Sequence, residues 1–333
     1  MPAIDGYRIG IVGALTIVGK ELVTILRDRV FPLTRLALLT DDEEEVGTLA
    51  DGVVEPVFLK ATSREELQDL DYVFFCGDPS DIANWIAFRR ELGFVAIDLT
   101  QPSAFANEEP PRVAGIVSEE DAEDGLIISA HPIATMICLI LDPLMQLGKI
   151  DHFSASVLVP ASESGQEGID ELFQQTLAVL NAEGPPREVF EQQMAFNVYS
   201  PSGAADLERF VLRQIREICG TDLEGSLLVQ QGATFHSHAL ALHVEMAEPL
   251  DDSVVRRALE AGESVGFGDP DTFPGITDAG GIDEILIVRL HQDHHRPRSL
   301  WIQAASDNLR RSSALNAVML VEEILGRSGA GPN

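Results

Sequence analysis

The stretch YRIGIVGALTIVGKELVTILRD (residues 7–28) decides the fold of the first part of the chain. Its apolar run ends at Gly13, and the apolar residues after Lys20 recur at helical spacing, which predicts a strand, a tight turn and a helix. Further apolar runs separated by helical segments predict strands at residues 36–40, 71–77, 94–100 and 126–130. Near-continuous apolar strands of this kind are typical of a parallel sheet buried on both faces. We therefore expect an α/β fold that begins with a Rossmann-like, doubly wound domain over residues 1–130.

The pattern changes at residue 151 to alternating strands, and an α+β domain is expected there. The predicted strands include FSASVLVP (153–160), HALALHVEM (238–246) and SLWIQAAS (299–306), with helices between several of them. Such a sheet leaves one face free for a partner. The closing segment SALNAVMLVEEIL (313–325) predicts an amphipathic helix that returns to the first domain. The predicted domains are residues 1–130 with 308–328, and residues 131–307.

Composition narrows the class of protein. The 333 residues include 45% hydrophobic ones, which suffices for two ordinary domains, and no apolar run is long enough to span a membrane. The segment before the first strand has no basic or apolar targeting stretch, so a cytoplasmic protein is expected. The net charge of −31 disfavours nucleic acid and anionic lipid as partners.

The cysteines and histidines give no metal motif. Cys76, Cys138 and Cys219 are widely spaced without a CxxC pair, so neither a disulfide framework nor a zinc knuckle is expected. His236 and His243 lack carboxylate or cysteine companions at ligand spacing. A second group, in LHQDHHRPRSL (290–300), is typical of a solvated turn between strands. No metal site is predicted.

Five strings in register resemble the aspartate-semialdehyde dehydrogenase family: GALTIVG (13–19), IDLTQPSAF (97–105), SESGQEGIDEL (162–172), FHSHALALHVE (235–245) and DNLRRSSALNAV (307–318). The resemblance implies an N-terminal domain that binds NADP and a C-terminal catalytic and dimerisation domain. It also implies a cysteine thiolate that attacks the substrate, a histidine base, and hydride transfer between thiohemiacetal and thioester.

The nucleophile that the resemblance implies is missing from its place in SAHPIATMICLILDPL (129–144). Counted back from Leu141-Asp142-Pro143-Leu144, the position falls on Pro132; aligned on the proline, it falls on Ala134. Neither side chain is a nucleophile. Cys138 is expected two turns into the helix on its buried face. Cys76 is the other thiol to consider, because it ends a predicted parallel strand, where ligands bind in open α/β sheets.

The base position is kept. His238 stands where the family has its Gly-His, whereas the polar contacts that the family uses are replaced. The phosphate-binding Arg corresponds to Ala106, the carboxylate-binding Arg to Gln231, and the orienting Gln before the Ser-Gly-Ala-Gly turn to Val159. A Glu-x-Lys pair is only approximated at residues 208–210, and Arg216 is interpreted as a surface or inter-element ion pair.

The dinucleotide loop is altered as well. By resemblance its residues are Gly13, Thr16, Ile17, Val18 and Gly19, with Asn308 on the nicotinamide side. Thr16 replaces the middle glycine, and its Cβ would crowd the phosphates. The acidic stretch at Asp41 and Asp42 stands where the family binds the ribose 2′-phosphate, so NADP is disfavoured while NAD is tolerated.

These losses favour a Usg-type, dehydrogenase-like branch of the family that keeps the scaffold and dimerises but does not reduce aspartyl phosphate. QMAFNVYSP (193–201) fits that branch. Such a protein would bind a nucleotide or metabolite of unknown identity, or another protein. An active NAD(P)-dependent oxidoreductase that uses His238 without a covalent intermediate is the alternative, and a purely structural or interaction protein is the third hypothesis.

Overall fold

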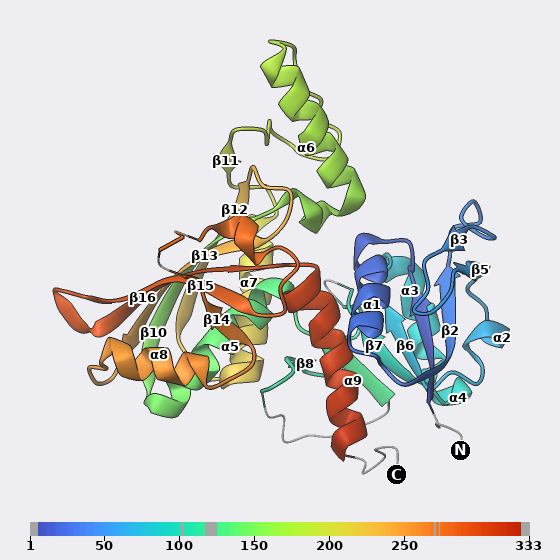
Figure 1. The fold of residues 1–333 in the computed structure, drawn as a ribbon, viewed down its shortest axis with the longest axis horizontal. Coiled ribbons are helices and arrows are strands. Elements are labelled where there is room, and N and C mark those ends of the chain that lie inside the picture. Colours follow the sequence, from blue (N-terminus) through green and yellow to red (C-terminus); the bar gives the residue numbers. More distant parts are fainter. Residues whose placement is uncertain (1–5, 101–102, 117–124, 270, 273, 328–333) are drawn as a thin grey trace. The chain divides into compact units, whose positions relative to one another are not determined.

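The computed structural model describes residues 6–100, 103–116, 125–269, 271–272 and 274–327. The chain forms two compact units, Met1–His131 with Ser313–Asn333 and Pro132–Ser312, each with its own sheet (Figure 1). The sequence had predicted 131–307 for the second unit. Residue 328, the last of the predicted C-terminal part, lies outside the described residues.

The first unit is built on a seven-stranded sheet in the order β5-β2-β1-β6-β7-β9-β8, in which every pair is parallel. The strands are β1 (Tyr7–Val12), β2 (Leu33–Thr40), β5 (Lys60–Ala61), β6 (Tyr72–Phe75), β7 (Val95–Asp98), β8 (Pro111–Arg112) and β9 (Leu126–Ser129), and a separate pair is formed by β3 (Leu49–Ala50) and β4 (Val57–Phe58). The predicted parallel sheet is confirmed. The strand order reverses at β1, between β2 and β6, which is where ligands bind in open α/β sheets.

Helices cover both faces of this sheet, as the uninterrupted apolar strands predicted. One apolar cluster joins the sheet to α1 (Ile17–Asp28) and α9 (Leu315–Arg327), and the other includes Ile82 and Ile86 of α3 (Pro79–Ala87). The segment WIAFRRELG (85–93) has a helical pattern, but the helix is broken at Phe88, whose N–H donates to Trp85 O at 3.1 Å in a tighter turn before α4 (Arg89–Leu92). The remaining helix, α2 (Arg64–Leu67), is a single turn.

The closing helix α9 belongs to the first unit, as predicted. Asn316 is fully buried and fixes it there: Oδ1 accepts from Ala114 N at 2.9 Å, and Nδ2 donates to Ser129 Oγ at 2.9 Å and to Arg112 O at 3.2 Å. A π-helical turn, Arg310–Ala314, precedes the helix.

The second unit has a mixed seven-stranded sheet in the order β11-β12-β10-β13-β16-β15-β14. Its strands are β10 (Ile150–Val159), β11 (Val198–Tyr199), β12 (Gly225–Gly232), β13 (His238–Met246), β14 (Val265–Phe267), β15 (Ile285–Asp293) and β16 (Arg296–Ser306). The helices are α5 (Pro132–Leu147), α6 (Gly165–Leu180), α7 (Ala204–Cys219) and α8 (Asp252–Glu260), with short 3-10 turns at Ala161–Ser164 and Ile276–Ala279. An α+β unit was expected and is found.

This second sheet has one covered and one open face. Along β13 the buried residues alternate with half-buried ones, and α5, α7 and α8 contact the sheet from the covered side. On the open side the rings of His243 and Trp301 lie 4.8 Å apart, and the exposed fractions of Trp301 and Leu228 are 37% and 50%. The alternation therefore leaves the free face that the sequence predicted.

Candidate functional site

Pro132 is the first residue of α5. Proline suits the first helical position, because its missing N–H would have no partner inside the helix and its φ is already helical. Ala134, the other residue that alignment places at the nucleophile position, lies buried in the same first turn. Neither residue carries an atom that could attack a carbonyl carbon.

The three thiols differ in their surroundings. Cys138 is fully buried in α5, and burial raises its pKa well above the usual thiol value. Cys76 follows β6 and belongs to the first unit; its Sγ lies 3.3 Å from Val12 O and 3.4 Å from Gly13 O. Burial of that thiol raises its pKa to about 12, which the hydrogen bond from Thr16 only partly offsets. Both thiols are therefore protonated at neutral pH, whereas a nucleophile must be a thiolate.

His238 begins β13 and is completely buried. Its Nε2 lies 3.2 Å from Oε2 of Glu163, in the 3-10 turn Ala161–Ser164. This is an ion-pair distance without hydrogen-bond geometry, and within the described residues neither ring nitrogen has a hydrogen-bond partner. The carboxylate therefore lies against the base position, and its side chain is 23% exposed.

Asn308 forms hydrogen bonds with residues of two elements around His238. Its Oδ1 accepts from Ser162 Oγ at 3.1 Å and from Ser237 N at 3.0 Å, and its Nδ2 donates to Glu163 Oε2 at 3.3 Å. The amide thus connects the turn at Ala161–Ser164 with the start of β13. The sequence predicted Asn308 on the nicotinamide side of a cofactor, and the structure adds these contacts within the protein.

Ser237 precedes the histidine with a φ of +71°, in the left-handed region that favours glycine. The family resemblance has glycine at this position. Such a backbone persists only when its surroundings hold it, and the bond from Ser237 N to Asn308 is one contact that does so.

Glu163 was missed by sequence reasoning. By resemblance, Ser162 begins the stretch that corresponds to the Ser-Gly-Ala-Gly turn, so Glu163 stands at a glycine position. The signal was therefore present in SESG, but only the fold brings residues 163, 238 and 308 together.

Two positions that the resemblance assigned to polar contacts of the family bond each other. Gln231 is buried, and its Nε2 donates to Val159 O at 3.0 Å. The side chain at the predicted carboxylate-binding position thus bonds the backbone at the predicted orienting position. Arg216, expected in an ion pair, donates from Nη2 to the O atom of Thr221, just after α7, at 2.9 Å.

The β1–α1 loop has the geometry of a dinucleotide loop. Gly13 has a φ of +83°, and a Cβ on it would lie 2.7 Å from Gly77 N; a Cβ on Gly19 would lie 2.4 Å from Gly13 O. Thr16 caps α1, since its Oγ1 accepts from Gly19 N at 3.0 Å. The first and last glycines therefore serve the tight turn and the helix packing that such a loop requires.

Three other histidines belong to the hairpin of β15 and β16. His294 and His295 form the turn between β15 and β16, as predicted, while His291 lies within β15. Across the described residues, His, Cys, Asp and Glu side chains make no group of three that could hold a metal ion. Nor does any helix in the described ranges have the length and apolar character needed to cross a membrane.

Comparison with known proteins identifies the class. Residues 8–130 match the model of the semialdehyde dehydrogenase NAD binding domain, and residues 141–311 match that of the semialdehyde dehydrogenase dimerisation domain. The chain belongs to the semialdehyde dehydrogenase family.

Similar proteins fall into two groups. The USG-1 protein homolog of Azotobacter vinelandii is 31% identical over 338 residues, covering 97% of this chain and 98% of that protein. Aspartate-semialdehyde dehydrogenase 2 of Vibrio cholerae is 28% identical over 332 residues, covering 95% and 97%. The crystal structure of aspartate semialdehyde dehydrogenase II from Vibrio cholerae superposes with a TM-score of 0.89 at 25% identity, covering 97% of this chain and 99% of that one.

Proposed function

We propose that this protein is a semialdehyde dehydrogenase homologue that does not carry out the thiol-dependent reduction of aspartyl phosphate and acts instead as a dimeric nucleotide- or metabolite-binding protein. One observation carries the proposal: α5 begins with Pro132, where the family resemblance places the nucleophile. The thiols of Cys76 and Cys138, whose pKa values are raised by desolvation, offer no thiolate in its stead.

The site around His238 supports the same conclusion. The substrates of the family reaction carry carboxylate and phosphate groups, which cations recognise best. Here the base position faces the Glu163 carboxylate, and Gln231 is bonded to the backbone. An anionic substrate would meet repulsion where the family chemistry needs attraction.

The backbone of the β1–α1 loop, in the first unit, is suited to binding a dinucleotide. The N–H groups of Ile17 and Val18, in the first turn of α1, make no hydrogen bond that the described residues show, so they are available to a diphosphate. Gly13 and Gly19 would permit close approach, while the Thr16 side chain restricts it. A bound nicotinamide would supply a hydride donor or acceptor. With Asp41 and Asp42 exposed, we expect NAD to bind better than NADP.

Activity and binding are tested separately. Purified protein is assayed for NADPH- or NADH-dependent turnover of aspartate semialdehyde with phosphate, with Vibrio cholerae aspartate-semialdehyde dehydrogenase 2 as the positive control. No turnover above background is expected, and turnover would overturn the proposal. Cofactor binding is followed by NADH and NADPH fluorescence. Thr16→Gly is the matched variant, expected to tighten binding because it removes the Cβ at the cost of a few tenths of a kcal/mol at the helix cap.

A second candidate function rests on the proximity of His238 and Glu163. A buried imidazole beside a carboxylate can hold or release a proton, which suits hydride transfer to or from an alcohol without a covalent intermediate. This oxidoreductase would need a bound nicotinamide. If neither NADH nor NADPH binds at millimolar concentration, this candidate is removed while the first stands; if turnover is found, His238→Asn should abolish it.

The dimer is expected to form on the open face of the second sheet, because a monomer would leave Trp301 and Leu228 in water. The match to a dimerisation domain supports this. Light scattering should give twice the chain mass, and Trp301→Glu should give a monomer. A monomeric unmodified chain would remove this part of the proposal.

A further inference from the structure

Two of the three cysteines lie together in the second unit. Cys219 is the last residue of α7, and Cys138 lies in the second turn of α5, which packs against α7. Burial raises the pKa of Cys138, and the neighbouring Cys219 side chain raises it further, so the two thiols lie close to each other. The pair joins positions far apart in the sequence, and the CxxC rule could not reveal it.

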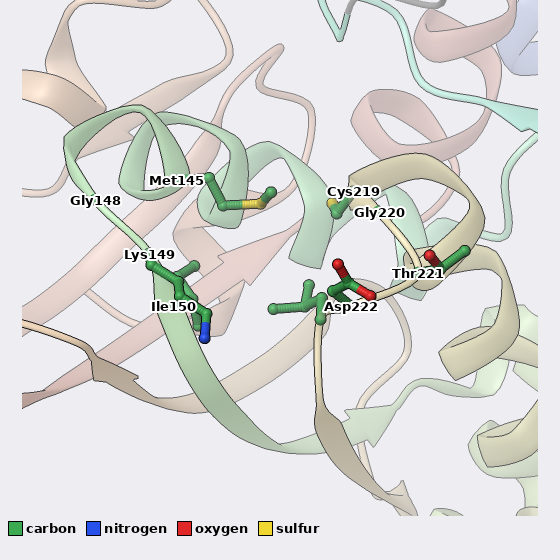
Figure 2. Close-up of a pocket in the computed structure, with 9 residues that line it drawn as sticks. Met145, Gly148, Lys149, Ile150, Cys219, Gly220, Thr221 and Asp222 are labelled. Atoms are coloured by element: carbon green, nitrogen blue, oxygen red, sulfur yellow. The ribbon is translucent and has the colours of Figure 1, made fainter.

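The two thiols differ in access. Cys138 is completely buried, whereas Cys219 lines a pocket of about 390 Å³ (Figure 2). Met145, Lys149 and Asp222 also line this pocket, and Figure 2 shows the Met145 side chain extended into the same space as Cys219. A small molecule that enters the pocket therefore reaches Cys219 before Cys138.

The position of Cys219 at a helix end gives it freedom to move. Gly220 follows with a φ of +114°, so the chain leaves the helix directly after the thiol. Cys138 is held inside α5, so Cys219 is the residue that can adjust. A disulfide needs an S–S distance of about 2.05 Å and a specific dihedral angle, so Cys219, at the end of its helix, is the residue that would move to meet them.

We propose that Cys219 and Cys138 form a redox-active dithiol site that reacts with low-molecular-weight disulfides entering through this pocket. The Cys219 thiolate attacks one sulfur of R–S–S–R; the S–S bond breaks, RS⁻ leaves, and a mixed disulfide forms on Cys219. Cys138 loses its proton and attacks Cys219 Sγ, which releases the second RS⁻ and leaves the Cys138–Cys219 disulfide. Two protein thiols are oxidised, one small disulfide is reduced, and the protons pass to the two leaving thiolates.

Lys149 favours an anionic disulfide such as oxidised glutathione. It is one of three lysines in the chain and, among the described residues that line the pocket, the only Lys or Arg. Its Nζ lies 3.6 Å from Asp151 Oδ1, so part of its charge is compensated. Burial raises the pKa of Cys138, which makes the closing step slower than the first.

The test is oxidation by glutathione disulfide, followed by intact mass spectrometry and peptide mapping after acid quenching and alkylation. The unmodified chain should gain one glutathionyl group on Cys219 and then lose it as the Cys138–Cys219 disulfide forms. In Cys138→Ala the adduct should persist, and in Cys219→Ser both products should be lost. Cys76→Ser is the matched control and should behave like the unmodified chain.

Two results would overturn the proposal. One is glutathionylation of Cys219→Ser at the rate of the unmodified chain; the other is a Cys138 that stays alkylatable after Cys219 has been fully modified. Lys149→Glu tests the route: slower addition, with a difference that shrinks as salt is added, is expected. If Lys149→Glu leaves the rate of glutathione addition unchanged, the disulfide does not reach Cys219 through this pocket and the proposed site is rejected. Far-UV circular dichroism of each variant checks that it is folded.

Discussion

Replacing Glu171 by Gln should loosen the segment that follows α6. The Glu171 carboxylate accepts from three consecutive backbone N–H groups, those of Glu188, Val189 and Phe190, at 2.7, 2.5 and 3.1 Å, and from Gln175 Nε2 at 2.9 Å. Each oxygen takes two of these four bonds. In Glu171→Gln, either orientation of the amide therefore turns an NH₂ group toward two donors.

The magnitude follows from those contacts. A hydrogen bond to a charged group contributes about 1.5–3 kcal/mol, so losing two of them costs about 3 kcal/mol at the lower end. Since about 1.4 kcal/mol is a factor of ten, amides of residues 188–190 should exchange hydrogen roughly 100-fold faster if the segment opens locally. Hydrogen-exchange mass spectrometry measures this without assuming a two-state transition for a two-unit chain.

The matched control is Glu188→Gln, which also removes one carboxylate charge. Residue 188 is exposed, and the substitution keeps its backbone N–H, which donates to Glu171. Its exchange should match that of the unmodified chain. If Glu171→Gln changes the exchange of residues 188–190 by less than about threefold, which is under 1 kcal/mol, the carboxylate does not hold this segment and the reasoning is refuted.

Three further outcomes are expected. Burial would raise the pKa of Glu171, but its hydrogen bonds to Val189, Glu188, Phe190 and Gln175 hold that pKa below its usual value. The stabilisation from this carboxylate is therefore complete above the ordinary glutamate pKa and is lost as the pH falls through the lowered pKa of the folded protein. Proteolysis of residues 186–195 should accelerate only in that acidic range. Ser237→Gly should stabilise the second unit by about 0.5–1 kcal/mol in urea unfolding, because glycine adopts a positive φ without strain and the N–H to Asn308 is kept; destabilisation would contradict this. Asn316→Ala removes three hydrogen bonds of a buried amide and should destabilise the first unit by about 3 kcal/mol. Unfolding of this unit is followed by Trp85 fluorescence, with Trp301→Phe introduced into the parent and the Asn316→Ala protein alike. A cost below about 1 kcal/mol would exclude the anchoring role of Asn316.

The fold could be predicted because apolar periodicity is a local property of the sequence. The runs around Ile11, Phe74 and Ile97 are apolar at most positions, and all three residues lie buried within the parallel sheet. The alternation along residues 238–246 likewise predicted a strand with one open face. The break at Phe88 was not foreseen, because residues 85–93 keep a helical pattern through it.

The candidate site could be predicted only in part. Family strings located His238 and Pro132, but the contacts of Asn308 with Ser162 and Glu163 span 146 and 145 positions, and no periodic pattern encodes them. The same holds for Cys138 and Cys219, which the sequence presented as unrelated thiols. Polar side chains that pair across such separations become visible only after the backbone has been placed.

The positions that the proposed function treats as altered also depend on one another through charge. A cysteine at Pro132 would supply the nucleophile that the proposal lacks, yet the Glu163 carboxylate would still lie against His238. A phosphate or carboxylate brought close to it would meet a charge of its own sign, which disfavours binding. Gln231, bonded to Val159 O, offers no cation to offset this. Under the proposed correspondence of residues, recovery of the family reaction should therefore need Glu163→Gly and Gln231→Arg together with Pro132→Cys, and Pro132→Cys alone should leave the protein without that activity.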